Sequence, residues 1–142
     1  MENKIYFLGK SKDFKLAEQL SLLIKDELKA ELEVAVVEKG FAPDRKFDAV
    51  AYELNDSIDL SLTDKAYSYS KGQSSADICG FNFMKREKSR SLDIFSSSFM
   101  GRVNIPVDSQ FTEESVLFCV AGFIAAGLAL PVVLKAINSK IS

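Results

Sequence analysis

The sequence contains no histidine among its 142 residues. Histidine is the commonest general base and the commonest metal ligand, so histidine-dependent triads and most zinc or iron sites are excluded. Cysteine is scarce too. Cys79 and Cys119 lie far apart in apolar surroundings, which favours buried free thiols over a disulfide framework or a metal site. We therefore expect no bound metal and no cofactor.

The sequence also has no large excess of positive or negative charge. The 18 basic and 20 acidic residues leave a net charge of −2, whereas a nucleic-acid surface needs a basic stripe. The one basic stretch, residues 85–90 (KREKSR), is interrupted by Glu87 and flanked by apparent strands. We interpret it as a solvated hairpin tip, so the sequence predicts no nucleic-acid partner.

The first eight residues lack the long apolar segment of a signal peptide, which makes the cytoplasm the expected compartment. The chain length fits one ordinary domain. An apolar fraction of 47% and a charged fraction of 27% are typical of globular proteins. These values predict a single domain over residues 1–142.

The N-terminal third alternates between strand-like and helix-like patterns. Residues 4–8 (KIYFL) form a short β-branched and aromatic run, and apolar residues then recur at helical spacing from Phe14 to Lys29. Two further strand-like runs follow at residues 32–37 and 47–54. This order predicts an α/β fold with a mixed sheet and an N-terminal amphipathic helix.

The middle of the chain consists of short alternating runs at residues 65–70, 76–87, 91–98 and 101–107, which predict a β-meander. Gly80, inside the second run, indicates a bulge or a close backbone approach. The residues expected on the inward faces are Ile78, Phe81, Phe83, Leu92, Ile94, Phe99, Val103 and Ile105.

Residues 116–134 (VLFCVAGFIAAGLALPVVL) carry no charge and are long enough for a membrane-spanning helix. Pro131 would interrupt such a helix but suits the first turn of a new one, and Gly127 suits a helix end. We therefore predict a C-terminal helix pair over about 112–126 and 131–138, with Thr112 as the cap of the first helix. A tail-anchored protein with helix 116–134 is the alternative, and membrane association is disfavoured.

Three segments together resemble the central domain of the Mur ligases, the ATP-dependent amide-forming enzymes of bacterial peptidoglycan assembly. Residues 105–137 (IPVDSQFTEESVLFCVAGFIAAGLALPVVLKAI) are similar to the closing part of that domain. Residues 50–57 (VAYELNDS) resemble the family's strand ending in Asn-x-Asp-Asp, and residues 66–83 resemble the strand, glycine, Ala-Asp and strand that follow it. The resemblance covers residues 50–137, the second half of the central domain.

The chain departs from the family at the residues that handle ATP. The family's phosphate loop carries glycines and Gly-Lys-Thr/Ser, because backbone amides and a lysine must neutralise the phosphates. Gly9-Lys10-Ser11 lacks the preceding glycine and its spacing, and we interpret it as a chance match. The family's magnesium-binding histidine is missing, and Ser115 stands where the family has the asparagine that contacts adenine.

Five residues form the candidate ligand-binding set: Gly9, Lys10, Ser11, Asn55 and Asp56. They follow two strand-like runs, and α/β sheets place ligands outside the carboxyl ends of their strands. Asn55 and Asp56 are equally explained by a turn in which their side chains satisfy the local backbone. No residue is assigned a catalytic role.

These features favour a non-catalytic Mur-ligase-like domain that acts by binding a protein, a metabolite or a second copy of itself, in connection with peptidoglycan precursor synthesis. One alternative is a subunit of a split Mur-type ligase whose partner chain brings the phosphate loop. Another is an enzyme of different chemistry, in which Asp77 would be a general base if it were buried.

Overall fold

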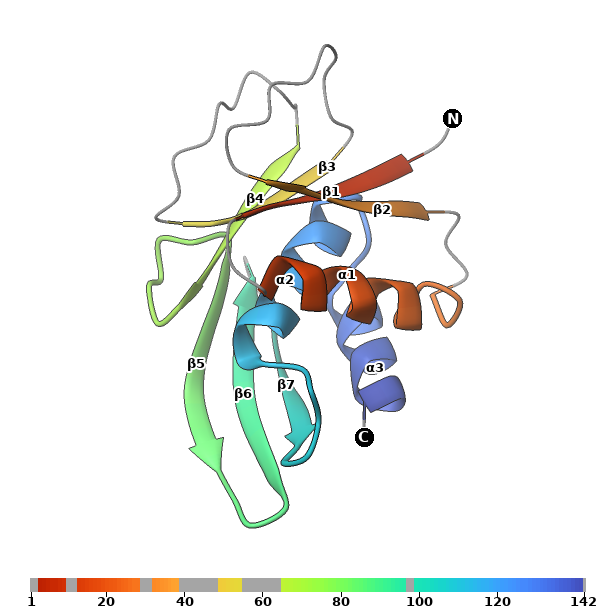
Figure 1. The fold of residues 1–142 in the computed structure, drawn as a ribbon. Coiled ribbons are helices and arrows are strands. Elements are labelled where there is room, and N and C mark those ends of the chain that lie inside the picture. The colour runs from red at the N-terminus through yellow and green to blue at the C-terminus, as the bar shows by residue number, and fades with distance from the viewer. Residues whose placement is uncertain are drawn as a thin grey trace.

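The computed structural model describes residues 3–9, 13–28, 32–38, 49–54, 65–96 and 99–141. Within these ranges the chain forms one mixed α/β domain, in which a curled seven-stranded sheet is packed against three helices (Figure 1). The strand order is β2-β1-β3-β4-β5-β6-β7. The predicted fold class is confirmed.

The first part of the sheet is parallel. Each neighbouring pair from β2 to β5 runs in the same direction, with Ile5 of β1 opposite Val34 of β2 and Ala49 of β3. Parallel neighbours need a crossover, and the amphipathic helix α1 (Asp13–Ile24) provides it between β1 and β2. The strands are β1 (Asn3–Gly9), β2 (Leu32–Glu38), β3 (Ala49–Glu53) and β4 (Ala66–Lys71).

The second part of the sheet is a meander of three antiparallel strands: β5 (Ile78–Lys85), β6 (Ser89–Ser96) and β7 (Phe99–Pro106). The prediction that residues 65–70 belong to the meander is wrong, because these residues form β4, which pairs in parallel with β5. The register between β5 and β6 shifts between Phe81 and Met84, where Asn82 has a φ of 53°. The bulge predicted near Gly80 therefore lies just after it. Gly80 itself shows the close approach, since a Cβ there would lie 2.8 Å from Leu117 Cδ1.

The uncharged stretch forms two helices, as predicted. Helix α2 (Glu113–Ala125) begins at Thr112, which caps it, and α3 (Leu130–Ile141) has Pro131 in its first turn. Between them Gly127 has a φ of +100°, a conformation that glycine adopts without the steric cost of a Cβ. The alternative of one helix over 116–134 is wrong. No helix among the described residues is long and apolar enough to cross a membrane.

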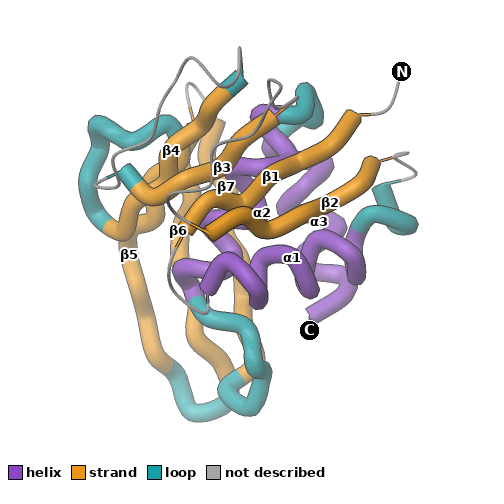
Figure 2. Tube along the Cα trace, turned by 45° about the horizontal axis from the view of Figure 1, so that its top comes forward, coloured by secondary structure: helices purple, strands orange, loops and turns teal. Residues whose placement is uncertain are grey.

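The described helices lie on the concave face of the sheet, so the core is a layer between them and the strands (Figures 1 and 2). Helix α2 crosses β1, β3, β4 and β5 and is also covered by α1. Phe118 of α2 packs edge-on against Phe7, with ring centroids 5.3 Å apart, and against Tyr69 at 4.7 Å. Both cysteines are free and buried, as predicted.

Candidate functional site

The predicted ligand-binding set follows β1 and β3 in the sequence. These strands are parallel neighbours, with Leu8 opposite Tyr52, so their last residues reach the same edge of the sheet. Gly9 is the final residue of β1 and pairs with Glu38 of β2. Lys10, Ser11, Asn55 and Asp56 lie outside the described residues, and their role in a site stays a prediction.

The connection between β1 and α1 is short. Strand β1 ends at Gly9 and α1 begins at Asp13, so only Lys10, Ser11 and Lys12 separate them. A phosphate loop of the Gly-x-x-x-x-Gly-Lys-Ser/Thr type places about five residues between its strand and its Gly-Lys. The connection after β1 is thus too short for such a loop, whatever the conformation of its residues.

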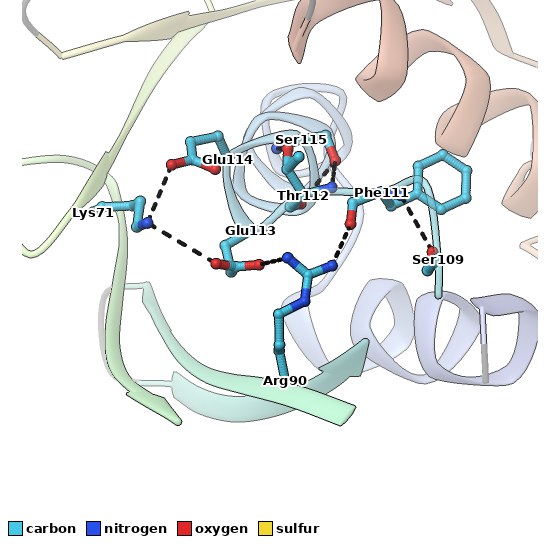
Figure 3. Close-up of polar contacts among 8 residues, drawn as sticks. All are labelled: Lys71, Arg90, Ser109, Phe111, Thr112, Glu113, Glu114 and Ser115. Carbon is cyan, nitrogen blue, oxygen red and sulfur yellow. Dashed lines mark hydrogen bonds and ion pairs between the residues drawn. The ribbon is translucent and has the colours of Figure 1, made fainter. Parts of the chain in front are cut away.

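A polar cluster lies at the start of α2, where three elements meet (Figure 3). We name Lys71, Arg90, Glu113 and Glu114 the α2 start cluster. Arg90 of β6 donates to Glu113 Oε1 at 2.7 Å and to the Phe111 carbonyl at 3.0 Å. Lys71, at the end of β4, lies 3.1 Å from Glu114 Oε1 and 4.0 Å from Glu113 Oε2.

The two cations and two carboxylates of the α2 start cluster neutralise one another, and Lys71 makes a further contact with an aromatic ring. The Lys71 ammonium also lies 4.8 Å from the centroid of the Phe83 ring, a favourable cation–π distance. Arg90 Nε is buried and has no hydrogen-bond partner within the described part of the chain. The Arg90–Glu113 pair is three-quarters or more buried, with side-chain exposures of 25% and 18%. It therefore ties β6 to α2 in a partly desolvated setting.

Side chains of this chain also occupy the first amides of α2. The Ser115 amide donates to Thr112 Oγ1 at 3.1 Å, and the Thr112 amide donates to Ser115 Oγ at 2.9 Å. This reciprocal capping box satisfies donors that a ligand anion would otherwise use. Glu113 and Glu114 add two carboxylates in the first turn, where they favour the helix dipole. A phosphate group approaching this helix end would find these amide donors and both nearby cations already paired.

Two other carboxylates make structural contacts. Asp93 accepts from Arg102 Nε at 2.8 Å and from Asn82 Nδ2 at 2.9 Å, and these bonds, Arg102 first, hold the pKa of Asp93 below its ordinary value. Asp77 accepts from the amide and the hydroxyl of Ser68 at 2.9 and 3.1 Å. Asp77 is exposed, so the condition for its being a general base is not met.

The thiol of Cys119 is unsuited to nucleophilic chemistry. Burial raises the pKa of Cys119 to about 12, partly opposed by its contact with Ser21 Oγ at 3.3 Å. A thiol with that pKa stays protonated at neutral pH, and the thiolate is the reactive form. The described residues also contain no group of three or more side chains of the metal-binding types His, Cys, Asp and Glu.

Sequence reasoning missed the α2 start cluster. It placed Arg90 in a charged hairpin tip, but the tip comprises residues 86–88 and Arg90 already belongs to β6. The signal for half of the cluster was visible, because Glu113 and Glu114 follow a capping threonine. The partners Lys71 and Arg90 are set by the register of two strands, and nothing local to either residue indicates the contact.

No protein-family model and no curated protein matches the chain. Solved structures do match. MurF from Acinetobacter baumannii superposes with a TM-score of 0.68 at 10% identity, covering 99% of this chain and 46% of that one. The UDP-N-acetylmuramoyl-L-alanyl-D-glutamate-2,6-diaminopimelate ligase gives the same score and identity over 96% and 46%. This chain has a Mur-ligase-like fold.

The Mur-ligase-like fold extends over the whole chain and is not limited to residues 50–137. A second structure from A. baumannii, the UDP-N-acetylmuramoylalanyl-D-glutamyl-2,6-diaminopimelate-D-alanyl-D-alanyl ligase, has a TM-score of 0.67 at 11% identity over 97% of this chain. The chain spans less than half the length of each of these ligases. At such identities the likeness concerns the fold alone.

Proposed function

We propose that this chain is a non-catalytic Mur-ligase-like domain that acts by binding, in connection with peptidoglycan precursor synthesis. The Mur-ligase-like fold supports the connection, since the similar structures are ligases of UDP-N-acetylmuramoyl peptides by name. Within this proposal, residues 50–137 correspond to the second half of the family's central domain, and the protein works in the cytoplasm.

The observation that carries the proposal is the short connection between β1 and α1. In a P-loop α/β domain the loop after the first strand holds the phosphates with backbone amides. Three residues between Gly9 and Asp13 leave no room for that loop. Two further observations agree with it: the chain has no histidine, and the start of α2 carries two carboxylates and a closed capping box.

Phosphate release tests the absence of catalysis. The purified chain is incubated with Mg-ATP, with and without a UDP-N-acetylmuramoyl peptide and an amino-acid acceptor. We expect no release above the rate in buffer. Lys10→Ala and Lys12→Ala serve as a matched pair, because Lys10 belongs to the predicted ligand set and Lys12 does not. Release that depends on Lys10 but not on Lys12 would contradict the proposal.

Thermal unfolding with the same compounds tests binding. A ligand at 100 times its dissociation constant stabilises the native state by about 2.7 kcal/mol, which raises the Tm of a domain of this size by roughly 5–10 °C. A rise with the UDP-N-acetylmuramoyl peptide supports a metabolite ligand. An unchanged Tm with every nucleotide, combined with no phosphate release, supports a protein ligand.

A further inference from the structure

Strand β7 is the last strand in the sheet order, and its outer edge is only partly closed. The Val107 amide donates to the Lys88 carbonyl at 3.0 Å. This bond shows that Val107 and every second residue before it point their backbone N–H and C=O groups toward β6. Since consecutive residues of an antiparallel strand point their backbone groups in opposite directions, Met100, Arg102, Asn104 and Pro106 direct theirs away from β6.

One half of this edge is closed by α3. Asn138 accepts from the Asn104 amide at 3.1 Å and donates to the Arg102 carbonyl at 2.9 Å, so its side-chain amide takes the place of a neighbouring strand. Pro106 closes the end of the edge in another way, because it has no backbone N–H to donate.

The other half of the edge, around Met100, is open. No described group pairs with the outward N–H and C=O of Met100. Met100 is 64% exposed, and Phe95, its partner across the β6–β7 ladder, is 44% exposed. Residues directly opposite one another project to the same face of a sheet. Met100 and Phe95 thus form an apolar strip beside the unpaired backbone, on the face away from the helices.

Charge marks the opposite face of the open edge. Lys135 is exposed and lies three residues before Asn138, so the two side chains share one face of α3. Arg102, two residues after Met100 and therefore on the same face of β7, is paired with Asp93. A strand laid along β7 would therefore meet apolar side chains on one face and a lysine on the other.

The area of the exposed apolar surface beside the open edge distinguishes a second copy of this chain from a smaller binding partner. At about 200 Å² for a large side chain, the exposed parts of Phe95 and Met100 amount to roughly 220 Å². A stable protein dimer buries about 800 Å² on each partner. The surface is too small for a stable dimer and suits one extended segment.

We propose that the open half of the β7 edge binds an extended segment of a partner protein by strand addition. The segment alternates apolar residues, which pack on Met100 and Phe95, with acidic residues, which face Lys135. This inference rests on the proposed binding function and names the kind of partner. It does not depend on the ATP assay, so the two can fail separately.

Fluorescence anisotropy with a labelled peptide of alternating valine and glutamate tests the proposal. Met100→Glu removes the apolar side chain and places a charge at the open edge that repels the glutamates of the peptide, so we expect binding to weaken about tenfold or more. Met84→Glu is the matched control, because Met84 is also exposed, at 47%, but lies at the far end of β5. It should leave binding unchanged. Lys135→Glu should shift the preference to a valine–lysine peptide.

Three outcomes would overturn the proposal. The first is no binding of the valine–glutamate peptide up to millimolar concentration by a folded chain, as judged by its cooperative melt. The second is equal binding of a peptide N-methylated on the nitrogens that would pair with β7. The third is a dimer, seen by sedimentation velocity and abolished by Met100→Glu, because a second copy would then be the occupant.

Discussion

Helices α2 and α3 come from one apolar region of the chain but occupy different environments. Ten residues of α2 are buried, including the continuous run from Ser115 to Phe123, because the sheet covers one side and α1 and α3 cover the other. Helix α3 buries Leu130, Val133, Leu134, Ala136, Ile137 and Ile141 and exposes all of the others except the half-buried Asn138. A helix enclosed between two layers loses the polar face that an outer helix keeps.

This difference explains why α2 is so apolar without crossing a membrane. Its composition is also limited by distance: a Cβ at Gly122 would lie 2.7 Å from Ile5 Cγ2 and from Phe7 Cε1. In the packing of α3 the glycine lies on the strand: Gly101 of β7 has no Cβ, and this leaves room for the Leu134 side chain of α3. Four experiments would test how far the two helices differ.

The largest expected effect concerns the thiol of Cys119 in α2. Because burial raises its pKa to about 12, native Cys119 should react with a thiol reagent at pH 8 about a thousandfold more slowly than in the unfolded chain. Cys79→Ala removes the other thiol, so that the rate reports Cys119 alone. Equal rates in buffer and in urea would mean that α2 opens readily to solvent.

The next effect is steric. Gly122→Val should lower the free energy of unfolding by about 3 kcal/mol or more, since the added atoms meet Ile5 and Phe7 in a packed core. Gly127→Ala is the comparison: nothing lies within 4 Å of its Cβ, and only the φ of +100° is unfavourable, which costs about 1 kcal/mol. Urea unfolding should rank the two variants in this order, and the reverse ranking would contradict the close packing of α2.

Removal of the α2 cap should have a smaller effect. Thr112→Ala deletes the oxygen that accepts from the Ser115 amide and should cost about 1 kcal/mol in urea unfolding. Thr112→Ser keeps that oxygen and should restore most of the stability. If serine fails to do so, the threonine methyl group contributes more than the hydrogen bond.

The smallest effect concerns α3. Asn138→Ala removes two exposed hydrogen bonds to β7, and because water can replace both, we expect a loss of about 0.5 kcal/mol. Ser139→Ala, on the exposed neighbouring position, is the control. Asn138→Ala should also lengthen the open edge and tighten binding of the valine–glutamate peptide. Weaker binding would indicate that Asn138 itself contacts the peptide.

Much of the fold could be predicted from local patterns. Apolar spacing predicted α1, and alternating runs predicted the strands, because each element buries one face. Thr112, Gly127 and Pro131 marked the ends of the C-terminal helices through backbone chemistry that a sequence displays directly. The predicted helix over 14–29 is shorter as an α-helix, ending at Ile24, and a turn continues to Leu28 through its bond to the Ile24 carbonyl.

The misses depend on contacts between distant segments. Phe83 and Phe99 were expected to face inward but are 40% and 58% exposed. Phe81 was also expected to face inward but is only half-buried, because it lies one residue after Gly80, whose Cβ direction points at α2. Directly after it the register shifts, and Asn82 there donates to Asp93 on the next strand. Likewise, the pairing of Arg90 with Glu113 depends on how β6 lies against α2. The register between two strands and the packing of a strand against a helix depend on many residues at once. These contacts could therefore not be predicted from the local sequence.

The position of β1 has a consequence for the nascent chain. Although β1 comes first in the sequence, it is an internal strand, flanked by β2 and β3. Its backbone groups find both partners only after residue 53 has been synthesised, and its contact with Gly122 of α2 comes later still. An apolar strand therefore lacks part of its cover until these later segments have been synthesised, and in that interval a chaperone or another nascent chain can pair with it.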